Sequence, residues 1–226
     1  MLSPHLEILP EAQRRLWPSL VGLARAGFVL YGGTAIALRY GHRMSVDFDL
    51  FSDRPLDRQH LSRELPWLRS AQVLQDQPET LTVLSPAPEL ENGVKVSFFG
   101  GLAIGRVGVP QISVDGVALV ASRFDLLAAK LKLLPQRAER KDDQEVAVLL
   151  GHGLALAEGP GAAKALDGAS FPGRGCLKAL VVFADGHLAE LGLSERRQLE
   201  QAVLAVDAIP GVERIGEQLV PSANLS

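Results

Sequence analysis

The spacing of hydrophobic and polar positions changes near residue 121. Up to that point, apolar runs of strand length alternate with segments in which leucine and alanine recur at helical spacing, and beyond it the spacing is mainly helical. We therefore expect an α/β domain over residues 1–121 and a helical domain over residues 122–226. The runs that predict strands cover residues 28–31, 46–51, 81–85, 94–100, 110–114 and 117–121.

Capping residues support several of the predicted helices. Ser122, followed by Asp125 three residues later, is typical of a capping box, and Ser194 is expected to be the N-cap of the last helix. Residues 151–175 are rich in glycine, proline and alanine and predict loop or weak helix, whereas residues 177–185 fit either a helix or a strand. Helices are predicted over residues 9–27, 34–40, 56–68, 123–134, 140–150 and 194–209.

Two dipeptides predict hairpin turns between neighbouring strands. Asn92-Gly93 precedes the run at 94–100, and Asp115-Gly116 joins the runs at 110–114 and 117–121. We expect each of these turns to join two antiparallel strands.

Composition narrows the class of protein. The 226 residues are 47% hydrophobic, enough for a substantial core, and the net charge of −3 gives no general basic field, so RNA or DNA would have to meet a local basic patch. Cys176 is the single cysteine, which excludes an internal disulfide and fits a reducing compartment. The first residues lack the pattern of a secretory signal, and no apolar run reaches the ~20 residues of a membrane helix. We expect a cytoplasmic protein that does not cross a membrane.

Residues 46–51 carry two carboxylates on one face of a predicted strand. Because successive side chains on a strand point to opposite faces, Asp47 and Asp49 lie on one face, and Phe48 and Leu50 lie on the other. Two neighbouring carboxylates repel each other and resist ionisation unless a cation compensates them. Mg²⁺ (or Mn²⁺) is the expected cation, because it takes one or two carboxylates together with phosphate oxygens and water.

A glycine pair stands between the preceding strand and helix. Gly32 and Gly33 have no Cβ atoms, so a phosphate can approach the free amides at the start of the helix. Thr34 is expected to cap that helix, to contact a phosphate, or both, and Arg43 lies in the loop where a triphosphate would be in reach. Each feature alone is common on solvent-facing surfaces, but strand, Gly-Gly, helix and a D-x-D strand in this order predict a site for nucleotidyl transfer.

The stretch GGTAIALRYGHRMSVDFDLFS, residues 32–52, resembles the signature of the AbiEii-type toxin family of nucleotidyltransferases, within the DNA polymerase β-like superfamily. The likeness continues in DLLAAKLKLL (125–134) and ERKDDQEVAVLL (139–150), which resemble family motifs containing a lysine and an R-K-D-x-x-D run, so it covers most of residues 28–150. The resemblance implies a nucleotidyltransferase fold of the α/β (α+β) class, with a small mixed sheet flanked by helices and a helical C-terminal region. It also implies Mg²⁺-dependent transfer of a nucleoside monophosphate from a nucleoside triphosphate to an acceptor hydroxyl. The implied acceptor is a tRNA 3′ end, and the implied partner of such a toxin is a separately encoded antitoxin.

The two helical motifs supply a second set of candidates. Lys130 is centred on an apolar stripe, where a lysine either extends to solvent or reaches into a cleft to hold a phosphate; the family's matching lysine favours the second, and with it a catalytic role. Asp142 shares a helix face with Val146 and Leu149, which predicts an inward, catalytic orientation, although the helix dipole alone also favours an acid there. Lys141 is a further candidate for contact with the nucleotide. If the acceptor is RNA, the expected phosphate contacts are Arg39, Arg43, Arg137, Arg140 and Lys141.

One position departs from the family pattern. Polymerase β-like enzymes often place a third carboxylate on a neighbouring strand, and Ser97, on the same strand face as Lys95, stands at that place here. Serine is not a useful general base without a partner. Either Asp142 or Glu145 supplies the missing carboxylate, or the protein is a nucleotide-binding module with weak or no transfer activity. A nucleotidyltransferase acting on a small molecule or a protein is the other alternative.

Overall fold

A computed structural model describes residues 1–86, 93–168, 170–184 and 186–221. These residues form two compact units: unit 1 contains residues 1–105, 109–121 and 216–221, and unit 2 contains residues 106–108 and 122–215. Asn92 of the first predicted turn lies outside the described residues. Within them, no helix is both long enough and apolar enough to span a bilayer.

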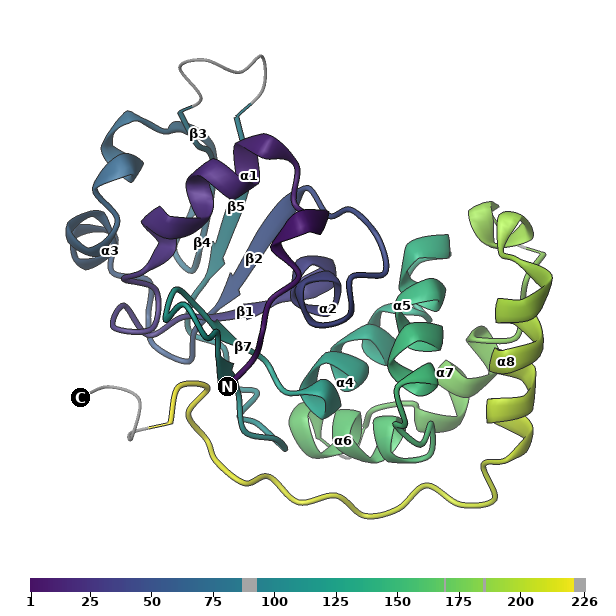
Figure 1. Ribbon diagram of the computed structural model, residues 1–226. Helices are drawn as coiled ribbons and strands as arrows, with labels where there is room; N and C mark the ends of the chain where they lie inside the picture. The colour runs from purple at the N-terminus through teal and green to yellow at the C-terminus, as the bar shows by residue number, and fades with distance from the viewer. Residues whose placement is uncertain (87–92, 169, 185, 222–226) are drawn as a thin grey trace. The chain divides into compact units, whose positions relative to one another are not determined.

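Unit 1 is built on one seven-stranded mixed sheet with the order β3-β4-β5-β2-β1-β7-β6 (Figure 1). Strand β2 lies at its centre, antiparallel to β1 and parallel to β5. This mixed sheet, flanked by helices, confirms the expected fold class. The strands are β1 (Val29–Tyr31), β2 (Asp47–Phe51), β3 (Gln72–Gln77), β4 (Thr80–Leu84), β5 (Lys95–Phe99), β6 (Gln111–Ile112) and β7 (Leu119–Val120).

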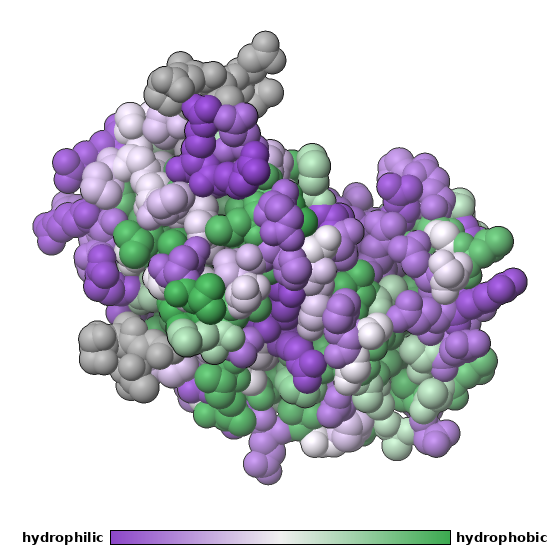
Figure 2. Space-filling view, viewed as in Figure 1, coloured by the Kyte–Doolittle hydropathy of each residue, from purple (hydrophilic) through white to green (hydrophobic). Residues whose placement is uncertain are grey.

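Prolines shorten two of the predicted helices in unit 1. Pro18 and Pro66 lack the backbone N–H that a helix interior requires, so the predicted helices 9–27 and 56–68 each end early and continue as 3₁₀-helix, labelled η. The outer face of α1 is hydrophilic (Figure 2), and its inner face buries Leu16. The helices of this unit are η1 (Leu6–Ile8), α1 (Glu11–Leu16), η2 (Trp17–Leu20), α2 (Gly32–Tyr40), α3 (Arg58–Glu64) and η3 (Pro66–Ser70).

The alternation along β2 anchors the strand in the core of unit 1. Phe48 and Leu50 are fully buried, and the ring centroid of Phe48 lies 6.1 Å from that of Trp17. Residues 47 and 49 are therefore held on the opposite face of the sheet. The predicted hairpin at Gly116 is confirmed by the antiparallel pairing of β6 and β7 and by the positive φ of 73° at this glycine.

Strand β3 was not predicted from the sequence. All six of its residues are exposed, because it is the edge strand of the sheet, so it shows no alternation of apolar and polar positions. Among them Val73 and Leu74 expose about half of their surface. A strand exposed on both faces does not carry the pattern that identifies a half-buried strand.

Unit 2 is helical, and the N-cap of its last helix differs from the expectation. The segment 151–175, expected to be loop or weak helix, contains the helix α6, and residues 177–185, for which helix and strand were left open, begin within α7 and form no strand in their described part. The expected N-cap at Ser194 is wrong, because Gly192 holds that position and α8 begins at Leu193. The helices are α4 (Arg123–Leu133), α5 (Arg140–Gly151), α6 (Glu158–Asp167), α7 (Gly173–Ala179), η4 (Gly186–Glu190) and α8 (Leu193–Leu204).

Small residues explain why α6 is stable despite its weak helix propensity. A Cβ added at Gly159 would overlap Leu131 of α4, and Ala162 and Ala163 pack against Ala128 in one buried cluster. The absence of larger side chains lets the two helices approach closely, so tertiary packing outweighs propensity.

Ser122 is confirmed as the N-cap of α4, but the side chain of Asp125 does not bond to the N-cap amide as it would in a standard capping box. The Ser122 hydroxyl accepts a hydrogen bond from the Asp125 amide (3.1 Å) and donates to Asp125 Oδ2 (2.6 Å). The other oxygen, Oδ1, accepts from the backbone amide of Val107 at 2.8 Å. The carboxylate thus fixes residues 106–108 to the start of α4.

Candidate functional site

The two aspartates of the D-x-D motif lie side by side on the face of β2 that is not buried in the core. In the sheet register Asp47 stands opposite Lys95, and Asp49 stands between Tyr31 and Ser97 of the neighbouring strands. Residues directly opposite each other in a sheet share a face. The face therefore presents a compact set of polar groups around two carboxylates.

A cation already compensates one of these carboxylates. Lys95 Nζ lies 3.2 Å from Asp47 Oδ2, and the two side chains are 46% and 40% exposed. An ion pair that is this exposed contributes little to stability, so a divalent ion would displace the ammonium at small cost. The Lys95–Asp47 ion pair supports the expectation that the carboxylates of Asp47 and Asp49 attract a cation.

Gly32 lies directly against the second carboxylate. Its φ of 70° is in the left-handed region, and a Cβ built on it would overlap Asp49 Oδ2. Glycine is therefore required here for two reasons, the backbone conformation and the close approach of Asp49. The contact places the Asp49 carboxylate at the start of α2.

The start of α2 leaves its first amides available to an anion. Tyr31 is the N-cap and makes no side-chain capping hydrogen bond, and the amides of a first helical turn, here including Gly33, have no intrahelical partner. Negative charge is favoured at this end of a helix. A phosphate would therefore be bound by the amides of α2 next to the cation site of β2.

Thr34 does not cap α2, so the interpretation as a helix cap is wrong. Its side chain is buried, and its Oγ1 donates a hydrogen bond to the backbone oxygen of Asp47 and lies 2.7 Å from Ser45 Oγ. Because the single Thr34 proton goes to Asp47, the Ser45 hydroxyl must be the donor in the second bond. Thr34 thus positions the first residue of the D-x-D motif, a role that sequence spacing did not indicate.

We expect Gly32→Ala to reduce nucleotidyl transfer by about 10²-fold, since the new Cβ displaces the Asp49 carboxylate and a shift of about 1 Å in a reacting group has this effect. Gly116→Ala is the matched control, because Gly116 has a similar φ of 73° but no atom within 4 Å of the added Cβ. Both variants should lose about 1–2 kcal/mol of unfolding free energy from the left-handed backbone, measured by urea titration. Equal activity of the two variants would contradict a role for the Gly32–Asp49 contact.

The predicted basic contacts near the motif differ in availability. Arg39 is held by the Gln111 side chain and by the Ala121 carbonyl oxygen (2.8 Å), so it connects α2 to the β6–β7 hairpin. Arg43 is half-buried beyond the end of α2, where it donates to the Met44 carbonyl at 2.7 Å.

Ser97 of β5 occupies the position at which polymerase β-like enzymes often have a third carboxylate. It is 4% exposed, lies opposite Asp49 in the register, and accepts a long hydrogen bond from Thr82 Oγ1 (3.4 Å). Over the described ranges, no three carboxylate, histidine or cysteine side chains converge on a point that could hold a metal ion. A divalent ion bound here would take Asp47 and Asp49 from the protein and its other ligands from a phosphate and water.

Unit 2 contains the second group of predicted residues. Lys130 is 6% exposed and does not extend to solvent; its ammonium pairs with Asp142 Oδ1 at 2.9 Å and with Glu145 Oε2. Both carboxylates are fully buried. Sequence reasoning placed Lys130 and Asp142 on inward faces, and the structure adds that they contact each other.

Arg137 completes this buried network from the loop between α4 and α5. Its Nε lies 2.7 Å and its Nη2 3.1 Å from the two oxygens of Asp142. Burial raises the pKa of the Asp142 carboxyl, but hydrogen bonds and charge from Arg137 and Lys130 outweigh it and hold the pKa below its ordinary value. Asp142 is therefore an ionised structural and electrostatic partner of two cations. The guanidinium of Arg137, a predicted RNA contact, is thus already paired with the Asp142 carboxylate.

The remaining basic candidates lie at the start of α5. Arg140 pairs with Glu190 of η4 at 3.0 Å. Lys141 is exposed, and no described residue forms an ion pair or hydrogen bond with its side chain. Lys141 is the more available of the two to an anionic ligand.

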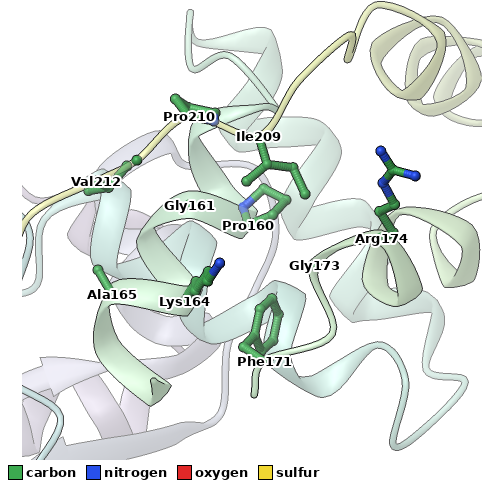
Figure 3. Close-up of a pocket in the computed structure, with 11 residues that line it drawn as sticks. Pro160, Gly161, Lys164, Ala165, Phe171, Gly173, Arg174, Ile209, Pro210 and Val212 are labelled. Carbon is green, nitrogen blue, oxygen red and sulfur yellow. The ribbon is translucent and has the colours of Figure 1, made fainter. Parts of the chain in front are cut away.

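A cavity of about 590 Å³ lies in unit 2 where α6, the start of α7 and residues 209–212 meet (Figure 3). Phe171, Ile209 and Val212 supply apolar surface, and Lys164 and Arg174 supply positive charge. Sequence reasoning did not find this cavity, because its walls come from segments that were expected to be irregular.

Comparisons with known proteins show the family of the chain. Residues 20–143 match the family described as nucleotidyl transferase AbiEii toxin, type IV TA system, and this range includes the D-x-D motif, Lys130 and Asp142. The chain is 32% identical over 154 residues to an uncharacterised protein of Aquifex aeolicus (strain VF5), an alignment that covers 66% of this chain and 71% of the relative. Among solved structures it is similar to MenT4, a nucleotidyltransferase toxin from Mycobacterium tuberculosis H37Rv, with a TM-score of 0.55, 14% identity and coverage of 84% and 82% of the two chains. At that identity the structural similarity shows the fold alone.

Proposed function

Because the chain belongs to the AbiEii family of nucleotidyltransferase toxins, we propose that it transfers a nucleoside monophosphate from a nucleoside triphosphate to the 3′ end of a tRNA, in a reaction that depends on Mg²⁺ or Mn²⁺. The observation that carries this proposal is the joint position of Asp47, Asp49 and Gly32. Two carboxylates share one open face of β2, and one of them lies against the glycine that starts α2. A cation site thus adjoins an anion site, which is what a metal–triphosphate complex requires.

Asp47 and Asp49 would hold the divalent ion, which supplies Lewis acidity at the phosphate oxygens and offsets the charge of the leaving pyrophosphate. The amides at the start of α2, beginning at Gly32 and Gly33, bind triphosphate oxygens. Thr34 keeps Asp47 in register with the helix through its bond to the Asp47 carbonyl. Lys95 neutralises Asp47 before the metal–nucleotide complex binds.

The proposed roles of the remaining predicted residues follow from how exposed they are and from whether they form ion pairs. Lys141 is an exposed cation and Arg43 a half-buried one, and both carry the charge suited to phosphate contacts with nucleotide or RNA. Lys130 and Asp142 form a buried pair, so we propose that they position the helices that carry the family motif as well as serving catalysis. Membership of a type IV toxin–antitoxin family also supports a separately encoded antitoxin as partner.

The test is a transfer assay with the full chain, Mg²⁺, each labelled nucleoside triphosphate in turn and total tRNA. We expect label from one or two triphosphates to appear in tRNA, and the rate at subsaturating tRNA to fall steeply with salt because RNA binding releases counterions. Transfer to a small molecule would show little dependence on salt. Reactions with a protein extract in place of tRNA test the protein alternative.

Ser97 motivates one specific alternative, a protein that binds nucleotide with weak or no transfer. In that case Mg²⁺-dependent nucleotide binding would persist without release of pyrophosphate under any acceptor condition. A Ser97→Asp variant that gains transfer would show that the missing carboxylate is the cause. No nucleotide binding at all would overturn the proposal.

A further inference from the structure

The buried network of unit 2 contains one carboxylate more than it contains cations. Arg137 pairs with Asp142, and Lys130 contacts both Asp142 and Glu145. Asp143, the next residue of α5, is 1% exposed, and its Oδ1 is buried with no hydrogen-bond partner among the described residues. A buried ionised carboxylate without a partner is strongly unfavourable, so Asp143 either takes up a proton or pairs with a cation that the described chain does not supply.

Asp143 lines a cavity of about 320 Å³ whose walls are part polar and part hydrocarbon. The apolar part of the lining comes from the end of α4, from α7, from the residues just after α7 and from η4, and it includes Leu134, Ala179, Val182 and Leu188. Residues 135–138 also line the cavity and are exposed, so it is open to solvent on that side. Its volume is at the lower end of the range for small-molecule sites.

The lining selects the kind of cation that fits. A divalent metal would need several oxygen ligands, whereas Asp143 is the single carboxylate among the residues that line this cavity. Arg137 also lines it, but its guanidinium is held by both oxygens of Asp142. A cation that donates its own hydrogen bonds and carries a hydrocarbon chain would match both the buried oxygen and the apolar walls.

We propose that this cavity binds a short aliphatic primary amine, whose ammonium donates a hydrogen bond to Asp143 and whose chain packs against Leu134, Val182 and Leu188. Binding to this cavity is measured without nucleotide.

The titration of Asp143 is consistent with this geometry. Burial, followed by the negative charge of Asp142, raises the pKa of Asp143 to about 7. Arg137, from the loop between α4 and α5, is the other charged residue among those that line the cavity, and its guanidinium is paired with Asp142. Binding is therefore best measured at pH 8, where Asp143 is mostly ionised and the amine is protonated.

The probe is n-butylamine, titrated into the full chain at pH 8 and followed by backbone amide shifts in NMR spectra. We expect saturable shifts at Asp143 and Leu188, and at least about tenfold weaker binding for Asp143→Asn, which removes the charge but keeps the shape. Glu200→Gln is the matched control, because it removes an exposed carboxylate from α8 and should leave binding unchanged. The neutral probe 1-butanol, of the same length, should cause no saturable shift.

A second variant leaves the carboxylate in place. Ala179→Met narrows the cavity and should also weaken binding of n-butylamine by at least about tenfold, since little free volume is left for the chain. Equal affinity of the wild type, Asp143→Asn and Ala179→Met would overturn the proposal. Shifts that grow without saturation, or that Glu200→Gln reduces as much as Asp143→Asn does, would also overturn it.

Discussion

Asp47→Asn and Asp49→Asn should each lower Mg²⁺-dependent transfer by about 10³-fold or more while the protein stays folded. The reduction corresponds to the loss of several kcal/mol of electrostatic stabilisation at the transferring phosphate, at 1.36 kcal/mol for each factor of ten. Folding should be little affected, because the Asp47 side chain is 40% exposed and its ion pair with Lys95 is exposed as well. Steady-state transfer rates and urea unfolding curves of the same preparations measure the two effects separately.

Asp76→Asn is the matched control for these substitutions. Asp76 is also a strand aspartate with a basic partner, Arg58, but it lies on the edge strand β3 rather than on β2. It should keep wild-type transfer. Mg²⁺ together with nucleotide should raise the melting temperature of the wild type and of Asp76→Asn, but not that of Asp47→Asn. A Mg²⁺-induced shift of equal size in all three proteins would show that the ion binds elsewhere.

Local patterns predicted the part of the site that lies on consecutive elements. The alternation of β2 placed Asp47 and Asp49 on one face, and Gly32 marked the turn before α2, because each of these features depends on a few neighbouring residues. The contact between Gly32 and Asp49 was not predicted. It depends on the antiparallel register of β1 and β2, in which Tyr31 stands opposite Asp49.

The interactions of buried charges were the part that sequence reasoning could not supply. An apolar stripe around Lys130 predicts the direction of its side chain but not its partners, Asp142 and Glu145, which come from the next helix. The same holds for Thr34, whose hydroxyl was expected to cap the helix or to contact a phosphate; the cap prediction is wrong, and the hydroxyl binds the backbone of Asp47. A polar side chain chooses among partners that only the tertiary structure brings within reach.

Lys130→Met should destabilise the protein by about 3–5 kcal/mol, the largest effect on folding that we expect from one substitution. It leaves Glu145, which is fully buried, without the ammonium that compensates it, and it leaves Asp142 with Arg137 as its remaining cation. The measurement is the unfolding free energy from urea titration at pH 7.5. Transfer activity of the folded fraction, measured in parallel, tests the proposed catalytic role.

Lys132→Met is the control from the same helix, two residues further on. Lys132 pairs with Asp167 at an exposed position, so the loss should be about 0–1 kcal/mol. The double variant Lys130→Met/Glu145→Leu should recover much of the stability, because replacing a whole buried ion pair by apolar residues is often neutral, whereas removing one partner is not. If this variant regains stability without activity, Lys130 has a role in transfer beyond folding; if it regains both, the lysine serves the structure alone. If Lys130→Met is as stable as Lys132→Met, the buried ion pairs of Lys130 with Asp142 and Glu145 do not contribute to the stability of the fold.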